Sequence, residues 1–411
     1  MKITILMCLA ILWGLSAAQS VVAQNLVVRN ARVLDGNGGV INRGTIVVRR
    51  GRISSVSENP VVDVDLPIFD AQGMTVMPGF IDAHRQVIQG DPDEWMEQAA
   101  ERMREYLEAG FTTVLSAGDP IGYALELRDR LDFREITGPR LLVSAHVPLI
   151  SDSGDAVSQE EIRETIRDLA LMGADAVALT VRATPGGREK ETLSAARDEA
   201  DQQGLLTITH IETIEDAVTA VEGGSGYLTR TPHVGAFDEE MARNIVETGR
   251  ANAEYGLVMT STLGIFLPAF ADRNAYVRAG VGDDDNVPRF TDLEPFPINR
   301  LSSASQGLVN ARILWNAGII YGFGTGTPFP PSDALPHELI PLKLVFSNND
   351  IVTILTKNAA FSVRRDDALG TLEPGKFADM VILGGDPLAD IDNLLNVEVV
   401  IRTGQIVVDN R

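Results

Sequence analysis

The sequence predicts an α/β protein: a TIM-like (β/α)₈ barrel with a small β-sandwich domain built from both chain ends. Eight short β-rich runs alternate with stretches of helical periodicity in the middle of the chain, and further β-rich runs lie at both ends. The 411 residues leave room for a barrel of about 250 residues and a smaller domain. No glycine-rich dinucleotide fingerprint follows a predicted strand, which weighs against an open doubly wound sheet.

Residues 1–23 form a predicted signal peptide. Lys2 supplies a positive charge, the stretch 3–15 is almost continuously apolar, and small residues lead to a cleavage site after Ala23. A membrane anchor would need about 20 apolar residues, which is longer than this run. We therefore expect a periplasmic or secreted protein that has no membrane attachment after the signal is removed. The single cysteine, Cys8, leaves with the signal, so the mature chain is expected to fold without disulfides.

Both ends of the remaining chain have the pattern of a small antiparallel sheet. After the signal, strand-like runs lie at 26–28, 31–34, 45–48 and 52–53, with glycine-containing turns at 35–39 and 50–51. Matching runs near the C-terminus lie at 379–383, 397–401 and 406–408. We assign residues 24–77 and 367–411 to one composite β-sandwich domain.

Residues 78–366 form the predicted barrel. Its strands are expected at Met74–Ile81, Thr112–Ser116, Arg140–Ser144, Ala176–Val181, Leu205–His210, Gly226–Arg230, Leu257–Thr260 and Ile319–Phe323. Ser158 and Glu161 have the spacing of a capping box that opens a helix, and helical periodicity also occupies 97–108, 190–203, 239–254 and 350–363. The longest irregular stretch, 262–300, follows the seventh strand, where a barrel places its catalytic loops, and we interpret it as a substrate loop or lid.

The charge balance limits the classes of partner. The formal net charge is −22, and a surface this acidic repels nucleic acids and anionic membranes. We therefore expect a small-molecule substrate or ligand and no nucleic-acid partner.

Several motifs, in order along the chain, resemble those of the amidohydrolase superfamily, in particular its imidazolonepropionase-like and prolidase-like branch. They are NARVLDG at 30–36, VMPGFIDAH at 76–84, short glycine-containing motifs at 110–114, 138–140 and 173–175, and LGTLEPGKFAD at 369–379. The resemblance covers nearly the whole mature chain. It implies a barrel hydrolase that acts on amide, cyclic amide or lactone bonds of small molecules, with divalent metal ions at the ends of the barrel strands. It also suggests a homodimer.

Two of the family's metal-binding histidines are retained. The resemblance implies a His-x-His motif after strand one, a carboxylated lysine after strand four, histidines after strands five and six, and an aspartate after strand eight. His84 occupies the first position and His210 ends the fifth strand. His233 lies three residues beyond the expected position after strand six. If it turns inward, His84, His210 and His233 would form a three-histidine site with water as the fourth ligand.

The other four positions are changed. Gln86 replaces the second histidine, Ala178 the lysine, Arg230 the strand-six histidine and Gly326 the aspartate. An amide is a poorer zinc ligand than imidazole, and alanine and glycine carry no ligand atom. We therefore expect either one zinc-like divalent ion or, with more weight, no metal or a weakly bound one. Asp333 and Glu338, which we place in a loop after strand eight, are candidates to replace the missing carboxylate base.

The remaining polar residues support a metal-poor site that favours an anionic oxygen. We predict His84, His210 and Arg230 as catalytic residues, and Arg85, Gln86 and Glu212 as substrate-binding residues, because a cationic, hydrogen-bonding mouth suits a carboxylate or similar group. The loop 182–188 either clamps an anion or only connects two elements. His146 falls in no familiar ligand position, so we interpret it as an ordinary surface residue.

These residues leave three functions open. The first is an exported hydrolase of carbon–nitrogen or lactone bonds in a small molecule, with an atypical metal-poor site. The second is a non-catalytic descendant that binds a ligand through the same mouth. The third is a metal-free lyase or isomerase that uses His210 as a base. The family resemblance favours the first, and the four altered ligand positions favour the second.

Overall fold

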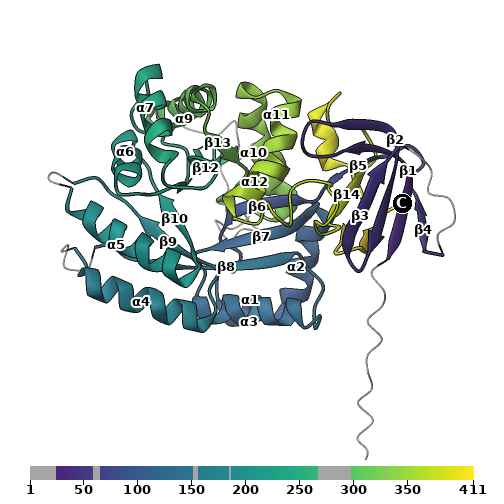
Figure 1. The fold of residues 1–411 in the computed structure, drawn as a ribbon, viewed down its shortest axis with the longest axis horizontal. Coiled ribbons are helices and arrows are strands. Elements are labelled where there is room, and N and C mark those ends of the chain that lie inside the picture. The colour runs from purple at the N-terminus through teal and green to yellow at the C-terminus, as the bar shows by residue number, and fades with distance from the viewer. Residues whose placement is uncertain (1–24, 59–64, 151–155, 185–186, 267–297, 328) are drawn as a thin grey trace, which may run out of the picture.

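The computed structural model describes residues 25–58, 65–150, 156–184, 187–266, 298–327 and 329–411 (Figure 1). The predicted signal peptide and most of the predicted loop at 262–300 lie outside these residues. No helix in the described ranges is long and apolar enough to cross a membrane.

The centre of the molecule is the predicted barrel of eight parallel strands. Neighbouring strands follow the order of the chain from β6 to β13. Two backbone hydrogen bonds join the last strand to the first: Ala83 N–H donates to the Phe323 carbonyl at 3.0 Å, and Gly326 N–H to the His84 carbonyl at 2.9 Å. The strands are β6 (Phe80–Arg85), β7 (Phe111–Ala117), β8 (Arg140–Val147), β9 (Ala176–Thr180), β10 (Leu206–His210), β11 (Tyr227–Thr229), β12 (Val258–Thr260) and β13 (Ile320–Gly322).

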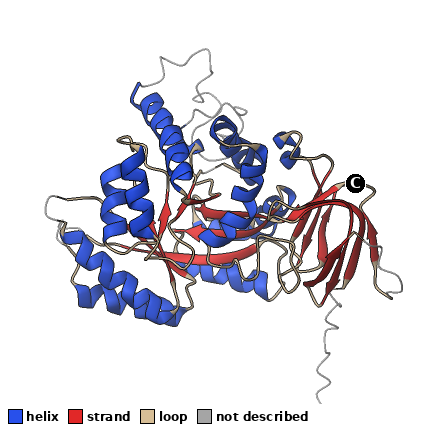
Figure 2. Cartoon of the chain, turned by 45° about the horizontal axis from the view of Figure 1, so that its top comes forward, coloured by secondary structure: helices blue, strands red, loops and turns tan. Residues whose placement is uncertain are grey.

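Helices cover the outside of the barrel (Figures 1 and 2). The Ser158 cap is confirmed, because its side chain accepts the Glu161 N–H at 3.2 Å. The helical elements are α1 (Pro92–Glu97), α2 (Ala99–Glu108), α3 (Ile121–Asp132), α4 (Gln159–Met172), α5 (Arg188–Gln203), α6 (Ile214–Glu222), α7 (Glu239–Gly249), η1 (Gly264–Phe266), α9 (Ile298–Ala317), α10 (Pro331–Val345), α11 (Asn348–Thr353), the π-helical η2 (Ile354–Asn358) and α12 (Ala359–Ser362).

One helix lies where the sequence suggested a loop. Asp333 and Glu338 belong to α10, which begins directly after Pro330. Two prolines inside this helix, Pro336 and Pro341, hid it from a sequence-based interpretation, because proline ordinarily ends a helix.

Both chain ends contribute to a second sheet beside the barrel, which confirms the composite domain. Its strands form one mixed sheet in the order β16-β15-β14-β5-β1-β2-β3, with β4 beside β1, and β1 pairs in parallel with β4 and β5, so the sheet is not purely antiparallel as predicted. The strands are β1 (Leu26–Leu34), β2 (Val40–Arg49), β3 (Arg52–Ser57), β4 (Ile68–Asp70), β5 (Thr75–Pro78), β14 (Met380–Leu383), β15 (Val397–Arg402) and β16 (Gln405–Asp409), with the short helix η3 (Ile391–Leu395) before β15.

The predicted first barrel strand, 74–81, is in fact two strands in two sheets. β5 pairs with β14 of the composite sheet, whereas β6 pairs with β7 of the barrel. Gly79 lies at the junction, where an added Cβ atom would come within 2.2 Å of the Thr112 hydroxyl. Glycine is therefore required for the chain to pass from one sheet to the other at this close approach.

The two sheets are held together by a cationic contact around one aromatic ring. The guanidinium carbons of Arg52 and Arg140 lie 4.1 and 4.4 Å from the ring centroid of Phe377. Arg140, at the start of β8, also pairs with Asp379 at 3.0 Å. Because β8 belongs to the barrel and Asp379 precedes β14, these contacts fix the composite sheet against the barrel.

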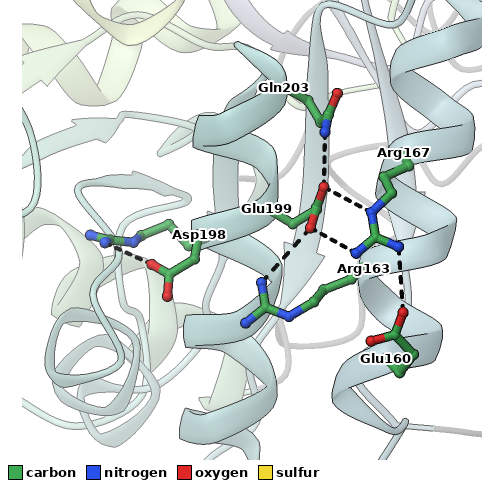
Figure 3. A network of polar contacts seen from close by, with 7 residues as sticks. Glu160, Arg163, Arg167, Asp198, Glu199 and Gln203 are labelled. Atoms are coloured by element: carbon green, nitrogen blue, oxygen red, sulfur yellow. Dashed lines mark hydrogen bonds and ion pairs between the residues drawn. The ribbon is translucent and has the colours of Figure 1, made fainter.

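A polar network joins two of the outer helices, α4 and α5 (Figure 3). Glu199 of α5 accepts hydrogen bonds from Arg167 of α4 at 3.1 and 3.2 Å and from Gln203 at 2.9 Å. Arg163 and Glu160 extend the network along α4 at 3.9 and 3.4 Å from their partners. The Arg167 guanidinium lowers the pKa of Glu199, so this network fixes the two helices through a charged carboxylate.

Candidate active site

The C-terminal ends of the barrel strands bring the retained family positions together. His84 lies on β6, His210 ends β10, Arg230 directly follows β11, and Gly326 follows β13. These four residues are partly exposed, as is Ala178 on β9, whereas most other strand residues of the barrel are buried. The C-terminal end of the strands is where barrel enzymes carry their sites, and we call this end of the barrel the mouth.

Two histidines face each other in this mouth. The ring centroids of His84 and His210 are 5.7 Å apart, with the rings inclined at 76°. Burial, the neighbouring His210 and Arg230 lower the pKa of His84 to about 3. Burial and Arg230, followed by His146, Arg182 and His233, lower the pKa of His210 to about 4. Both imidazoles are therefore neutral near neutral pH, and His84 Nδ1 is buried with no hydrogen-bond partner among the described residues.

Arg230 supplies the fixed positive charge of the site. Its backbone has φ = +72°, an uncommon conformation for a residue other than glycine. Its side chain is only 18% exposed and lies 3.5 Å from the Glu212 carboxylate, which is 47% exposed. The charge of Arg230 acts on both His84 and His210, so the predicted catalytic residues share one mouth, with Glu212 at its edge.

The donor set does not fit the metal centre that the family resemblance implies. Within the described ranges, no group of three or more His, Cys, Asp or Glu side chains could hold a metal ion. The expected three-histidine site is therefore not assembled, because the structure does not join His233 to the other two in such a group. His233 is buried, and its backbone N–H donates to the Glu212 carbonyl at 3.1 Å. A guanidinium beside two neutral imidazoles also repels a divalent cation.

Gly326 occupies the position at which the family resemblance implies a carboxylate. A Cβ atom added there would lie 3.0 Å from Thr262 Cγ2 and 3.5 Å from His84 Cδ2. The position is thus beside His84, but glycine carries no side-chain oxygen there.

Arg85 does not point into the mouth as predicted. It is 2% exposed, and its guanidinium donates to Tyr106 Oη at 2.6 Å, to Thr325 Oγ1 at 3.0 Å and to the Phe329 carbonyl. All of these partners belong to the protein, so we correct its expected substrate-binding role to a structural one. Gln86, the next residue, is exposed beyond the end of β6.

Glu338 is not available as a replacement base. It is fully buried, and its two carboxylate oxygens accept the backbone N–H groups of Leu263 at 2.8 Å and Gly264 at 2.6 Å. The carboxyl therefore holds the turn after β12 against α10. Burial raises its pKa to about 8, so the folded protein binds a proton on this group more tightly than the unfolded chain does.

This raised pKa predicts a stability that falls as the pH rises. The pKa of Glu338 is about 8 in the folded protein and 4.5 ordinarily. The stabilisation that the protonated Glu338 carboxyl gives to the folded state is therefore fully present below about pH 4.5, and it is lost as the pH rises from about 4.5 to about 8. We expect Glu338→Gln, which cannot ionise, to remove part of the decline in the free energy of unfolding over this range. Urea denaturation of both proteins at closely spaced pH values measures this, and identical pH profiles would contradict it.

Two further polar residues lie at this end of the barrel: His146, to which the sequence-based interpretation gave no role, and Arg182, which it left as either part of an anion clamp or part of a connection. His146 lies near the end of β8, which extends to Val147 rather than ending at Ser144, and its Nε2 is 3.2 Å from Thr180 Oγ1 on β9. Arg182 follows two residues later. The charges of His146 and Arg182 both contribute to lowering the pKa of His210. A strand end extended by three residues would have revealed His146.

Comparisons with known proteins agree with this architecture. The model of the Amidohydrolase family matches residues 75–407. Imidazolonepropionase of Porphyromonas gingivalis is 24% identical over 393 residues, covering 85% of this chain and 84% of that protein. A Xaa-Pro dipeptidase structure with bound methionine superposes with a TM-score of 0.72 at 20% identity, over 93% of this chain and 99% of the other. Molinate hydrolase gives 0.74 at 18% identity, over 94% and 95%. At these identities the two structures establish the fold alone.

Proposed function

This chain belongs to the amidohydrolase family, and on that premise we propose that it hydrolyses an amide, cyclic amide or lactone bond in a small molecule through a metal-poor site. The observation that carries the proposal is the pair of neutral imidazoles, His84 and His210, 5.7 Å apart in a mouth that also holds Arg230. The relative imidazolonepropionase supports a small-molecule substrate.

The residues present supply the elements of a hydrolysis. His210 accepts a proton from water while the water oxygen bonds to the substrate carbonyl carbon, and the carbonyl π electrons move to its oxygen. The guanidinium of Arg230 stabilises the resulting oxyanion. When the carbonyl re-forms, the carbon–nitrogen or carbon–oxygen bond breaks and protonated His210 returns its proton to the leaving atom. His84 accepts a hydrogen bond from the attacking water or the substrate.

A second candidate is a non-catalytic protein that binds a ligand through this mouth. The observation that favours it is the loss of ligand atoms at Gly326 and Ala178, because the family's base and bridging group are absent there. A metal-free lyase or isomerase with His210 as base uses the same residues but would release no hydrolysed product.

We also propose that the protein is exported, which rests on the N-terminal sequence pattern alone. A homodimer remains a prediction from the family resemblance.

A hydrolysis screen with matched variants tests the proposed function. We expect the mature protein to hydrolyse at least one member of a panel of amides, cyclic imides and lactones, and His210→Gln to lower kcat/KM by about 100-fold or more, the usual scale of general-base catalysis. His337→Gln is the control, because His337 is buried, has no role in the proposed reaction and bonds the Gly264 carbonyl at 2.7 Å, and glutamine retains a donor. If folded protein hydrolyses no panel member with or without added zinc, the proposed hydrolase is contradicted, and the ligand-binding protein and the metal-free lyase or isomerase are the candidates left.

A further inference from the structure

The turn between β1 and β2 of the composite sheet contains the only Asn-Gly pair of the chain, Asn37-Gly38. Both residues are exposed. Gly38 has φ = +93°, and a Cβ atom added to it would have no neighbour within 4 Å. Its N–H forms no hydrogen bond with any residue that the structure describes. The Gly38 nitrogen is therefore accessible to the Asn37 side chain, because neither packing nor a hydrogen bond holds it.

The backbone on either side of this nitrogen is held by the side chain and backbone of Asp35. Asp35 Oδ1 accepts the N–H groups of Asn37 at 2.7 Å and of Gly39 at 2.8 Å. The Asp35 N–H donates to the Gly39 carbonyl at 3.1 Å, and its carbonyl accepts the Leu372 N–H at 2.8 Å. The last bond attaches the turn to the segment before β14. The Gly38 N–H thus lies between two bonded N–H groups, in a turn that is itself anchored.

We propose that Asn37 is a modification site, at which the chain converts its own side-chain amide to a carboxylate through a succinimide. The Gly38 nitrogen bonds to Asn37 Cγ and gives up its proton, the Cγ–Nδ2 bond breaks, and ammonia leaves with that proton. Glycine suits the attacking position because it has no Cβ atom to obstruct ring closure. Water then adds to one of the two imide carbonyl carbons, the bond from that carbon to the Gly38 nitrogen breaks, and the nitrogen regains a proton. Opening at Cγ gives aspartate, and opening at the backbone carbonyl carbon gives isoaspartate.

Two nearby residues lack the features that make Asn37 reactive. Asp35 also precedes a glycine, but its carboxylate is held by two N–H groups and Gly36 is buried. Asn42 is exposed in the same hairpin, but an arginine follows it, and its Oδ1 accepts a hydrogen bond from Arg32 at 2.5 Å. The reaction is therefore confined to Asn37 within this hairpin, and Asn42 is its matched control.

The modification places a new negative charge beside Glu373. The hydrogen bond from Thr371 lowers the pKa of Glu373 most, and the Asn37 side chain contributes to the same shift, so the amide lies next to a charged carboxylate. A carboxylate at position 37 loses the amide donor and repels Glu373. Isoaspartate also lengthens the backbone by one carbon in the turn that follows the pairing of Leu34 with Val40. The modified turn is therefore held less firmly against the segment that carries Glu373.

Ageing of the intact protein, followed by peptide mass spectrometry, tests the site. Samples kept at neutral and mildly alkaline pH are digested, and the mass gain of the amide-to-acid conversion is followed at Asn37 and Asn42. Isoaspartate is detected separately with an isoaspartyl methyltransferase and a labelled methyl donor. Asn37→Gln is the matched variant, because glutamine keeps the amide but has to close a six-membered ring. Thermal unfolding of fresh and aged samples of both proteins measures the effect on stability.

We expect acid and isoaspartate to accumulate at Asn37 and not at Asn42, and faster at the higher pH, because the attacking nitrogen must lose its proton. Asn37→Gln should slow the conversion at this position about tenfold or more, which corresponds to about 1.4 kcal/mol of activation free energy. Aged parent protein should unfold at a lower temperature than fresh protein, whereas the variant should be unchanged by ageing. Equal rates at Asn37 and Asn42, or acid without isoaspartate, would overturn the succinimide site. Conversion with no change in unfolding temperature would contradict the weakened turn.

Discussion

Protein purified without chelators is expected to contain far less than one divalent metal ion per chain. A structural or catalytic zinc site needs three or four nitrogen, sulfur or oxygen ligands from the protein, and no group of three such side chains occurs among the described residues. The guanidinium of Arg230 near both mouth histidines adds a repulsive charge. Elemental mass spectrometry on the purified protein, before and after incubation with zinc and desalting, measures the content.

His84→Ala and His210→Ala provide the matched controls, and neither should change the metal content. About one ion per chain, lost in both variants, would contradict the prediction and restore a metal-dependent mechanism. A variant with Gln86→His, Ala178→Lys, Arg230→His and Gly326→Asp serves as the positive control, because it reinstates the four altered positions. Aspartate tolerates the left-handed backbone at residue 326, where φ is +58°, so we expect this variant to gain zinc.

Removing Arg85 is expected to cost more stability than any other single change at the barrel mouth. Its guanidinium joins Tyr106 of α2, Thr325 and the Phe329 carbonyl. Thr325 in turn donates to Asp82 at 2.6 Å, a fully buried carboxyl whose pKa is raised by burial and lowered by Arg85. Arg85→Met leaves this carboxyl buried without its compensating charge, and we expect the free energy of unfolding to fall by about 3 kcal/mol or more. Urea denaturation measures the change.

Two variants show whether the loss comes from the buried charges. Arg49→Met removes the same charge from an exposed position in the composite sheet and should change the free energy of unfolding by less than about 0.5 kcal/mol. In the double variant with Asp82→Asn, the buried carboxylate is gone, so the combined loss should be smaller than the sum of the single losses. Additive losses, or an Arg85→Met variant as stable as the parent, would contradict the structural role of Arg85.

At the site, the position of His84 could be predicted from the sequence, whereas the partners of its neighbour Arg85 could not. The motif VMPGFIDAH located the strand and its end, and the structure confirms His84 in the mouth. Successive side chains of a strand point to opposite faces, so His84 and Arg85 cannot both enter the lumen. The hydrogen-bond partners of Arg85 are Tyr106, Thr325 and Phe329, which lie 21, 240 and 244 positions away in the chain. That pairing is not encoded in any local pattern.

Contacts distant in the sequence also decide the surroundings of three further residues, His146, Glu338 and Arg182. The end of β8 could not be located to within three residues, and its pairing with β9 is what brings His146 to the mouth. The two prolines in the helix that carries Glu338 made this segment look like a loop, so Glu338 was a candidate replacement base. In the structure its carboxylate accepts two backbone N–H groups in the turn after β12. The fixed backbone around Arg182 depends on Asp216 and Glu189, which cap other elements.

The sequence by itself determined the (β/α)₈ barrel and the smaller domain built from both chain ends, and it predicted that four of the six ligand positions implied by the family resemblance are changed. Periodicity, turn residues and short motifs are local properties, and each of them can be recognised without knowing the partners of a residue. Only the tertiary structure decided which polar side chains lie at the mouth and which, like Arg85, bond to buried protein groups instead. It also decided that the charge of Arg230 acts on both His84 and His210. Those outcomes depend on contacts between strands and helices far apart in the chain, where burial and neighbouring charge set the protonation and direction of each group.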